Sequence, residues 1–247
     1  MSDRANEDKK RRKKANAAES AVSLIKDGMV IGLGSGSTAE IAVRKIGDRI
    51  KAEGLEILGV PTSIRTEKLA IECGIPLTTL SEHPALDMCI DGADQVDARL
   101  NLIKGGWGSH TREKIVSYAT KKLVICVEED KIVKQLNMPV PLEVLPYAVE
   151  MVEMQLKKLG GTCVLRADRN KGGYFITEHE NLVIDADFGV IRNPEEMSAV
   201  LSSVVGSVEH GIFTNATEVH VGSEKAVNVL KKTKFKRRLT QINTDET

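Results

Sequence analysis

Apolar segments of strand length alternate with segments of helical spacing through the first half of the chain, and this alternation limits the possible folds more than any other feature. Residues 8–26 have apolar side chains at helical spacing up to Asp27-Gly28, and an apolar strand follows at residues 29–33. The same order then repeats, with a helix through Ala42 and Ile46, a strand at 55–60, a helix at 64–73, a strand at 86–90, a helix at 112–120 and a strand at 123–127. Such alternation favours a parallel sheet with helices on both faces.

The pattern changes at residues 137–141, where Pro139 and Pro141 indicate a domain boundary. The expected elements beyond it are a strand at 143–145, a helix from Pro146 to 159, strands at 162–165, 174–177 and 182–184, a helix capped by Asn193, and a strand at 212–213. Their order, β-α-β-β-α-β, is that of a ferredoxin-like unit.

A further strand at residues 218–221 is expected to return to the first sheet, followed by a basic helix or tail. The sequence therefore predicts an α/β protein with two domains. A Rossmann-like parallel-sheet domain comprises residues 1–137 and 214–247, and a ferredoxin-like α+β domain is inserted at 138–213.

Charge and apolar content argue against several classes of protein. The 35 basic residues balance 35 acidic ones, so no net charge attracts nucleic acid or an anionic membrane. We find neither a signal-peptide pattern nor a run of about 18 apolar residues. The four cysteines lack the spacing of a zinc site (Cys73, Cys89, Cys126 and Cys163). We expect a soluble, cytoplasmic protein that binds no metal, nucleic acid or membrane.

A glycine-rich turn lies between the strand at 29–33 and the next helix. It reads Gly-Leu-Gly-Ser-Gly-Ser-Thr and ends with Ser35, Gly36, Ser37 and Thr38. Glycines let the backbone approach an anion closely, and the helix N-terminus and the hydroxyl groups supply donors, so a phosphate fits here. The alternative is a tight turn with a serine cap. A dinucleotide fingerprint would need glycine at position 37.

Two acids follow the strand at 86–90, in the segment Asp91-Gly92-Ala93-Asp94. In open α/β sheets, ligands bind beyond the carboxyl ends of the strands, so these acids are candidates for acid/base chemistry or for binding hydroxyl groups. The alternative is a turn whose carboxylates face water. A divalent metal is conceivable, but no histidine or third carboxylate in this segment completes a ligand set.

The segment at residues 104–114 brings a cation, free amides and a carboxylate into one loop-to-helix turn. This grouping suits proton abstraction next to a carbonyl, with Glu113 as base and with Lys104, Gly105 and Gly106 as donors to the developing oxyanion. The alternative is a surface turn before a solvated helix. Lys131 adds a cation after the strand at 123–127, and three of these four motifs directly follow predicted strands, so they converge on one edge of the sheet.

In this order and at these separations, the four motifs resemble those of the A-type ribose-5-phosphate isomerases over nearly the whole chain. The resemblance implies interconversion of D-ribose 5-phosphate and D-ribulose 5-phosphate through an enediolate, without metal or organic cofactor, by a homodimer or homotetramer. It implies that Glu113 is the base and that Asp91, Asp94 and Lys104 assist ring opening and hold the sugar oxygens. The other implied substrate-binding residues are Lys14, Ser35, Gly36, Ser37, Thr38, Gly92, Ala93, Gly105, Gly106, Trp107 and Lys131.

The sequence departs from that family at Trp107, where a small residue is usual, and at His110, where an aliphatic one is usual. Ser35 stands where threonine is common, which keeps the hydroxyl. Two other functions remain open. A catalytically silent sugar-phosphate sensor on the same fold would be expected to lose Glu113, and a nucleotide-dependent dehydrogenase is disfavoured by the imperfect glycine pattern.

Overall fold

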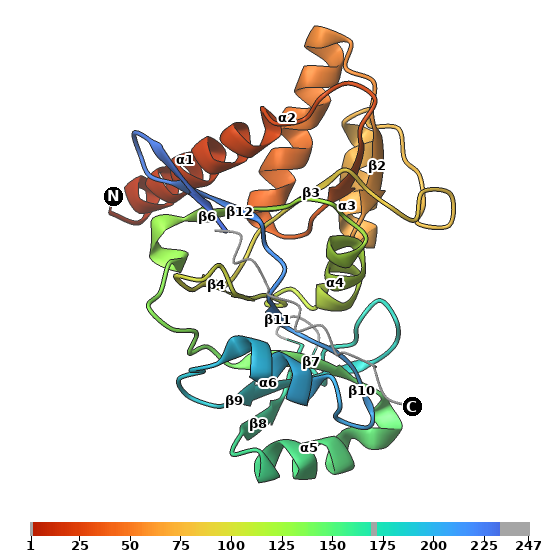
Figure 1. The fold of residues 1–247 in the computed structure, drawn as a ribbon, viewed down its shortest axis with the longest axis vertical. Coiled ribbons are helices and arrows are strands. Elements are labelled where there is room, and N and C mark those ends of the chain that lie inside the picture. The colour runs from red at the N-terminus through yellow and green to blue at the C-terminus, as the bar shows by residue number, and fades with distance from the viewer. Residues whose placement is uncertain (1, 169–171, 233–247) are drawn as a thin grey trace, which may run out of the picture.

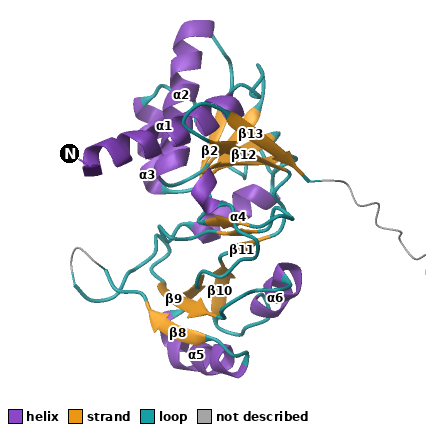
Figure 2. Cartoon of the chain, turned by 90° about the vertical axis from the view of Figure 1, so that its left-hand side faces the viewer, coloured by secondary structure: helices purple, strands orange, loops and turns teal. Residues whose placement is uncertain are grey.

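The computed structural model of the chain describes residues 2–168 and 172–232. A larger α/β part lies above a smaller α+β part in Figure 1, and a view turned by 90° shows the same separation (Figure 2). No helix within the described residues is both long enough and apolar enough to cross a bilayer.

The larger part is built on a six-stranded sheet with the order β13-β12-β6-β3-β1-β2. All neighbouring strands are parallel except β13, which pairs antiparallel with β12. Its elements are α1 (Ser2–Val22), β1 (Val30–Leu33), α2 (Ser37–Glu53), β2 (Leu58–Pro61), α3 (Ile64–Glu72), β3 (Met88–Asp91), α4 (His110–Tyr118), β6 (Leu123–Glu128), β12 (Glu218–Gly222) and β13 (Val227–Lys231). The parallel sheet and the return of the strand at 218–221 are confirmed.

Side chains alternate between the two faces of this sheet, as the two-residue period of a strand requires. Ile31, Ile90 and Val124 belong to one buried cluster with residues of α1, α2 and α3. Cys89 and Ile125 belong to another, with residues of α4 and of the segment before β12. The sheet is therefore covered on both faces, and α4 lies on the face opposite α1, α2 and α3.

The end of the described chain differs from the prediction of a basic helix or tail directly after residue 221. The Ser223 hydroxyl accepts a hydrogen bond from the Ala226 N–H and closes a hairpin. Residues 227–231 then form β13 at the edge of the sheet. The basic run beyond residue 232 lies outside the described residues.

A second, three-stranded sheet consists of β4 (Gln95–Val96), β5 (Leu102–Ile103) and β11 (Ile212–Phe213). The strand expected at 212–213 exists, but it pairs with β5 and not with the small domain. β4 and β5 were missed because two-residue strands are too short to show a periodicity.

The smaller part is a four-stranded antiparallel sheet with the order β10-β7-β9-β8. Its elements are β7 (Val140–Val144), η2 (Pro146–Ala148), α5 (Val149–Lys158), β8 (Thr162–Leu165), β9 (Leu182–Asp187), α6 (Pro194–Leu201) and β10 (Ser207–His210). The β-α-β-β-α-β order of a ferredoxin-like unit is confirmed. The division of the chain at 137/138 and 213/214 stays a prediction.

Two strands of this unit were assigned wrongly. Residues 174–177 form only isolated bridges, one of them at Tyr174 and one at Ile176. Both of these side chains are exposed and pack into no core, and the segment instead reaches the larger part, where Glu178 accepts a hydrogen bond from the Ile64 N–H at 2.8 Å. The closing strand is β10, whose mixed burial pattern gave no clear alternation.

Candidate active site

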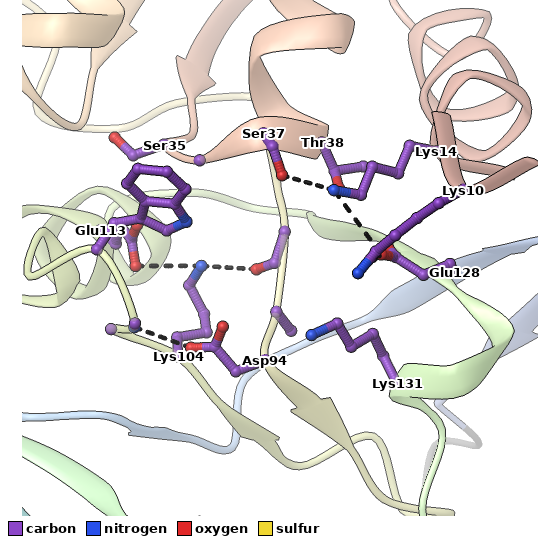
Figure 3. A pocket seen from close by; sticks show the side chains of 16 residues that line it. Lys10, Lys14, Ser35, Ser37, Thr38, Asp94, Lys104, Glu113, Glu128 and Lys131 are labelled. Atoms are coloured by element: carbon purple, nitrogen blue, oxygen red, sulfur yellow. Dashed lines mark hydrogen bonds and ion pairs between the residues drawn. The ribbon is translucent and has the colours of Figure 1, made fainter. Parts of the chain in front are cut away.

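The carboxyl ends of β1, β3 and β6 meet at a cavity of about 180 Å³ (Figure 3). The loops that follow these strands supply much of its lining, as expected for an open α/β sheet. It is smaller than the roughly 300 to 1,000 Å³ of sites for drug-sized ligands, so it suits a smaller molecule. The lining residues are Lys10, Lys14, Ser35, Gly36, Ser37, Thr38, Gly92, Ala93, Asp94, Lys104, Gly105, Gly106, Trp107, Glu113, Glu128 and Lys131. Every predicted site residue except Asp91 is among them.

Lys104 forms the centre of a buried charge cluster beneath this cavity. Its Nζ lies 3.0 Å from Asp91 Oδ2 and 3.1 Å from Glu113 Oε2, and it donates a hydrogen bond to the Gly92 carbonyl at 2.6 Å. Asp91 does not line the cavity, but this ion pair places it directly behind Lys104. The structure thus brings together three charged groups from β3, the loop after β5, and α4.

The two carboxylates of the cluster have different surroundings. Asp91 Oδ1 accepts hydrogen bonds from the N–H groups of Ser35 and Gly92, at 3.1 and 2.7 Å. Oε2 of Glu113 has its ion pair with Lys104 and no hydrogen-bond partner among the described residues. Backbone donors favour an ionised carboxylate, so Asp91 is stabilised as an anion in a way that Glu113 is not.

The pKa values of the cluster follow from this difference. Burial raises the pKa of Glu113 to about 8; the Lys104 ammonium opposes the shift and the Asp91 carboxylate adds to it. Burial also raises the pKa of Asp91, against Lys104 and the two N–H groups. Burial lowers the pKa of Lys104, but the two carboxylates outweigh it and the pKa stays above its ordinary value. Near neutral pH, a proton on Glu113 therefore leaves one ionised carboxylate, that of Asp91, beside the single ammonium group of Lys104.

The backbone around the cluster is tightly packed. A Cβ atom on Gly34 would collide with the Asp91 carboxylate, so only glycine lets the turn after β1 approach it. Gly105 has a φ of 104°, and a Cβ atom there would come 2.9 Å from the His110 ring. The Gly106 N–H donates to Asp94 Oδ2 at 2.9 Å, which joins two of the predicted motifs directly.

The opposite end of the cavity is cationic. Figure 3 shows Lys10, Lys14 and Lys131 at one end and Glu113 with Lys104 at the other. Lys14 Nζ donates to Ser37 Oγ at 2.7 Å, at the start of α2. Gly36 is the N-cap of α2 and provides no side-chain cap, so the first N–H groups of the helix remain available to an anion.

Ser35 differs from our expectation that its hydroxyl serves the ligand. Its Oγ lies 2.7 Å from both Thr62 Oγ1 and Ser63 Oγ, in a buried group of hydroxyls behind the loop. A side chain bonded in this way fixes the loop, so its hydroxyl is not a free donor to the cavity. Ser35 is still among the residues that line the cavity.

Trp107 and His110, the two departures from the family pattern, lie in different environments. Trp107 is 59% exposed, with the Arg65 guanidinium 5.6 Å from its ring centroid, and it borders the cavity near Gly36. His110 is fully buried, and burial lowers its pKa to about 4. His110 is therefore neutral near pH 7, and its ring lies against the Gly105 turn, outside the cavity lining.

Lys10 and Glu128 line the cavity but were not predicted. Lys10 is four residues before Lys14, a spacing that places both on one helix face and could have identified it. Glu128 ends β6, the position from which a strand residue reaches the ligand edge of the sheet. Its Oε1 lies 3.7 Å from Lys10 Nζ and 3.8 Å from Lys14 Nζ. In the described chain, no group of three or more His, Cys, Asp or Glu side chains has the arrangement of a metal site.

Comparisons with known proteins identify the family of the chain. Residues 58–226 match the family described as ribose 5-phosphate isomerase A (phosphoriboisomerase A). The ribose-5-phosphate isomerase A of Methanosarcina acetivorans is 49% identical over 85% of this chain and 90% of its own length. The solved ribose 5-phosphate isomerase A of Methanocaldococcus jannaschii is 44% identical, with a TM-score of 0.86 over 89% of this chain and 98% of that one. A solved D-ribose-5-phosphate isomerase in complex with phospho-erythronic acid is 40% identical, with a TM-score of 0.85 over 88% and 97%. The chain therefore belongs to the ribose 5-phosphate isomerase A family.

Proposed function

We propose that the chain interconverts D-ribose 5-phosphate and D-ribulose 5-phosphate through an enediolate, the aldose-ketose isomerisation of the non-oxidative pentose phosphate pathway. The observation that carries this proposal is the buried contact between the Glu113 carboxyl group and Lys104 Nζ at 3.1 Å, facing a cavity whose other end holds lysines and a helix N-terminus. The name of the Methanosarcina acetivorans relative supports the same reaction, and the phospho-erythronic acid bound to another relative supports a phosphorylated ligand.

Glu113 is the proposed base. In the open-chain aldose its ionised carboxylate takes the proton from C2, and the electron pair of that C–H bond forms the C1=C2 double bond while O1 becomes negative. The protonated Glu113 then returns the proton to C1, O2 loses its hydroxyl proton and O1 gains one, which leaves a C2 ketone. A carboxyl group whose pKa is about 8 can both accept and return a proton near neutral pH.

Lys104 and the amides of Gly105 and Gly106 are the proposed donors to the enediolate oxygens. Lys104 is buried and remains cationic beside Asp91, so its charge acts where little water screens it. Asp94 faces the cavity and is a candidate for holding sugar hydroxyls and for moving protons during ring opening, with Asp91 acting through Lys104.

The phosphate is proposed to bind at the cationic end. The N–H groups of Ser37 and Thr38 at the start of α2, with Lys14 and Lys131, provide donors and positive charge for it. Lys10 adds a further cation. This arrangement holds the sugar by its tail, so that C1 and C2 reach Glu113 at the other end of the cavity.

We further propose that the enzyme works without metal or organic cofactor, as a cytoplasmic homo-oligomer, either a homodimer or a homotetramer. The family resemblance supports the assembly, and sedimentation equilibrium of the purified protein distinguishes the two sizes from a monomer.

Turnover of ribose 5-phosphate in the presence of a chelator tests the proposal, with the parent chain and Glu113→Gln assayed together. If the parent forms ketose and Glu113→Gln does not, the result supports the proposed substrate, the independence from metal and the role of Glu113 as base. Binding of ribose 5-phosphate with no ketose formed by the parent would favour the alternative of a silent sugar-phosphate sensor.

A further inference from the structure

Residues on either side of Glu113 contact the smaller part of the molecule, whereas Glu113 faces the cavity. In both views α4 lies between the parallel sheet and the antiparallel sheet (Figures 1 and 2). The contacts are His110 Nε2 with Glu209 O (3.3 Å), Thr111 Oγ1 with Glu143 Oε2, Arg112 Nη1 with Glu178 Oε2 (2.9 Å) and Lys114 Nζ with Glu209 Oε1 (2.7 Å).

Glu143 is the most buried acidic group in this set of contacts. It lies within β7 and has no exposed surface. Its Oε2 accepts the Thr111 hydroxyl of α4, and its Oε1 accepts hydrogen bonds from residues that precede β9. These are the Thr177 hydroxyl at 2.8 Å and the Asn181 amide at 2.9 Å, with His179 Nδ1 at 3.1 Å. One carboxylate therefore connects α4 to the small sheet and its loop.

The donors around Glu143 keep it ionised. Burial alone would raise the pKa of Glu143, but the hydrogen bonds, with that of Thr111 the largest, hold it below the ordinary value. An anion beside the first turn of a helix is also favoured by the helix dipole. The bond to Thr111 is thus charge-assisted, and such bonds are stronger and more directional than neutral ones.

The first turn of α4 is held by contacts with other elements and not by a cap of its own. Its N-cap, Ser109, forms no side-chain cap. Further along the helix, Val116 packs against the parallel sheet at Cys89 and Gly32. Thr111 and Glu113 belong to the same first turn, so the bond that fixes one side of this turn also sets where the other side points.

We propose that Glu143 is a positioning residue for the isomerase: through the Thr111 hydroxyl it orients the first turn of α4 and so holds the Glu113 carboxylate at the substrate carbons. This inference rests on the proposed function, because it concerns how the base of that reaction is held. No described residue between 138 and 213 lines the cavity, so the smaller part acts on the site through the segments that it contacts. These are α4, which bonds to Glu143, and the Gly105 turn, whose carbonyl accepts a hydrogen bond from Arg166 at 2.8 Å.

Two threonines that donate to the same carboxylate provide a matched test. Thr111→Val removes the α4 hydroxyl that donates to Glu143, and Thr177→Val removes a donor on the loop side while leaving the link to α4. Thr111→Ser restores the hydroxyl. For each variant and the parent, kcat and KM for ribose 5-phosphate are measured together with the thermal unfolding midpoint.

We expect Thr111→Val to lower kcat by about tenfold to a hundredfold with KM within about twofold, because small displacements of a catalytic group cost rates of this size. Thr177→Val should keep kcat within about threefold of the parent on the same reasoning, and Thr111→Ser should recover most of the loss. If Thr111→Val fails to fold, Thr111→Ala removes the same hydroxyl without crowding the carboxylate and takes its place.

Equal effects of the two valine variants on kcat, or no recovery with serine, would overturn the positioning role and leave Glu143 with a structural one. A parent chain that forms no ketose would instead refute the proposed function itself. The two failures are therefore distinguishable.

Discussion

Replacing Glu113 by glutamine tests the chemistry most directly, because the amide is of nearly the same size and cannot take a proton. A positioned general base typically contributes about 10² to 10⁴ in rate, so kcat should fall by that factor. Binding should change little, since the phosphate is proposed to be held at the other end of the cavity. The assay is ketose formation from ribose 5-phosphate, with KM followed in the same experiment.

The pH dependence gives a second, quantitative test of the same residue. With the pKa of Glu113 at about 8 in the free enzyme, about a tenth of the molecules carry the ionised base at pH 7 and about half at pH 8. Since kcat/KM reports the free enzyme, it should fall about tenfold per pH unit well below 8 and level off above it. The residual kcat/KM of Glu113→Gln should not show this fall below pH 8.

Stability provides the control on folding. Because folded Glu113 binds its proton more tightly than a glutamate of pKa 4.5, the folded state holds more protons than the unfolded state between pH 4.5 and about 8. The free energy of unfolding contributed by this group should therefore fall as pH rises through that window, and Glu113→Gln should lose this decline in urea denaturation. A variant that folds and retains near-normal turnover would refute the assignment of Glu113 as base.

Three further substitutions test the rest of the site. Lys104→Met should lower kcat by about 10² to 10³ and destabilise the fold by about 3 to 5 kcal/mol, because the buried Asp91 carboxylate loses its cation; unchanged urea unfolding would contradict the second part. Lys14→Ala should raise KM about tenfold at low salt and less at high salt, since Lys14 is proposed to contact the phosphate; Lys13, which pairs with Glu129 outside the cavity, is the matched control. Trp107→Ala should change the free energy of unfolding by less than about 0.5 kcal/mol. It should raise the ratio of kcat/KM for six-carbon to that for five-carbon sugar phosphates by up to about tenfold. An unaltered ratio would show that the indole does not limit the size of the site.

The larger elements of the fold were predictable because their apolar periodicity is set by burial. Parallel strands buried on both faces appear as continuous apolar runs, as at residues 123–127, and amphipathic helices repeat every three to four residues. The two-residue strands β4 and β5 carry no such pattern. The segment at 174–177 has strand-like side chains, but tertiary contacts of Glu178 with α3 and α4 determine its path.

The site was predictable where its residues lie close together in the sequence or directly follow a strand. Lys104 and Glu113 occur in one segment, and Asp91 ends β3. Contacts between distant segments leave no such pattern. The bonding of Ser35 Oγ to Thr62 and the pairing of Glu143 with α4 depend on how separate elements pack, and that information is absent from local spacing.

Two buried carboxylates lie at the first turn of α4, one within the turn (Glu113) and one bonded to it (Glu143), and their surroundings indicate why their roles differ. Glu143 is surrounded by four donors that hold its pKa below the ordinary value. It therefore stays ionised, keeps its hydrogen bond to α4 and is a poor base. Glu113 is also buried but, apart from Lys104, lacks such partners, so its pKa rises to about 8. A buried carboxylate that is fully hydrogen-bonded stabilises geometry, whereas one left without donors retains a strong affinity for a proton. Proton transfer at C1 and C2 needs a carboxylate without such donors, as in Glu113. Holding that carboxylate in place needs a fully hydrogen-bonded one, as in Glu143.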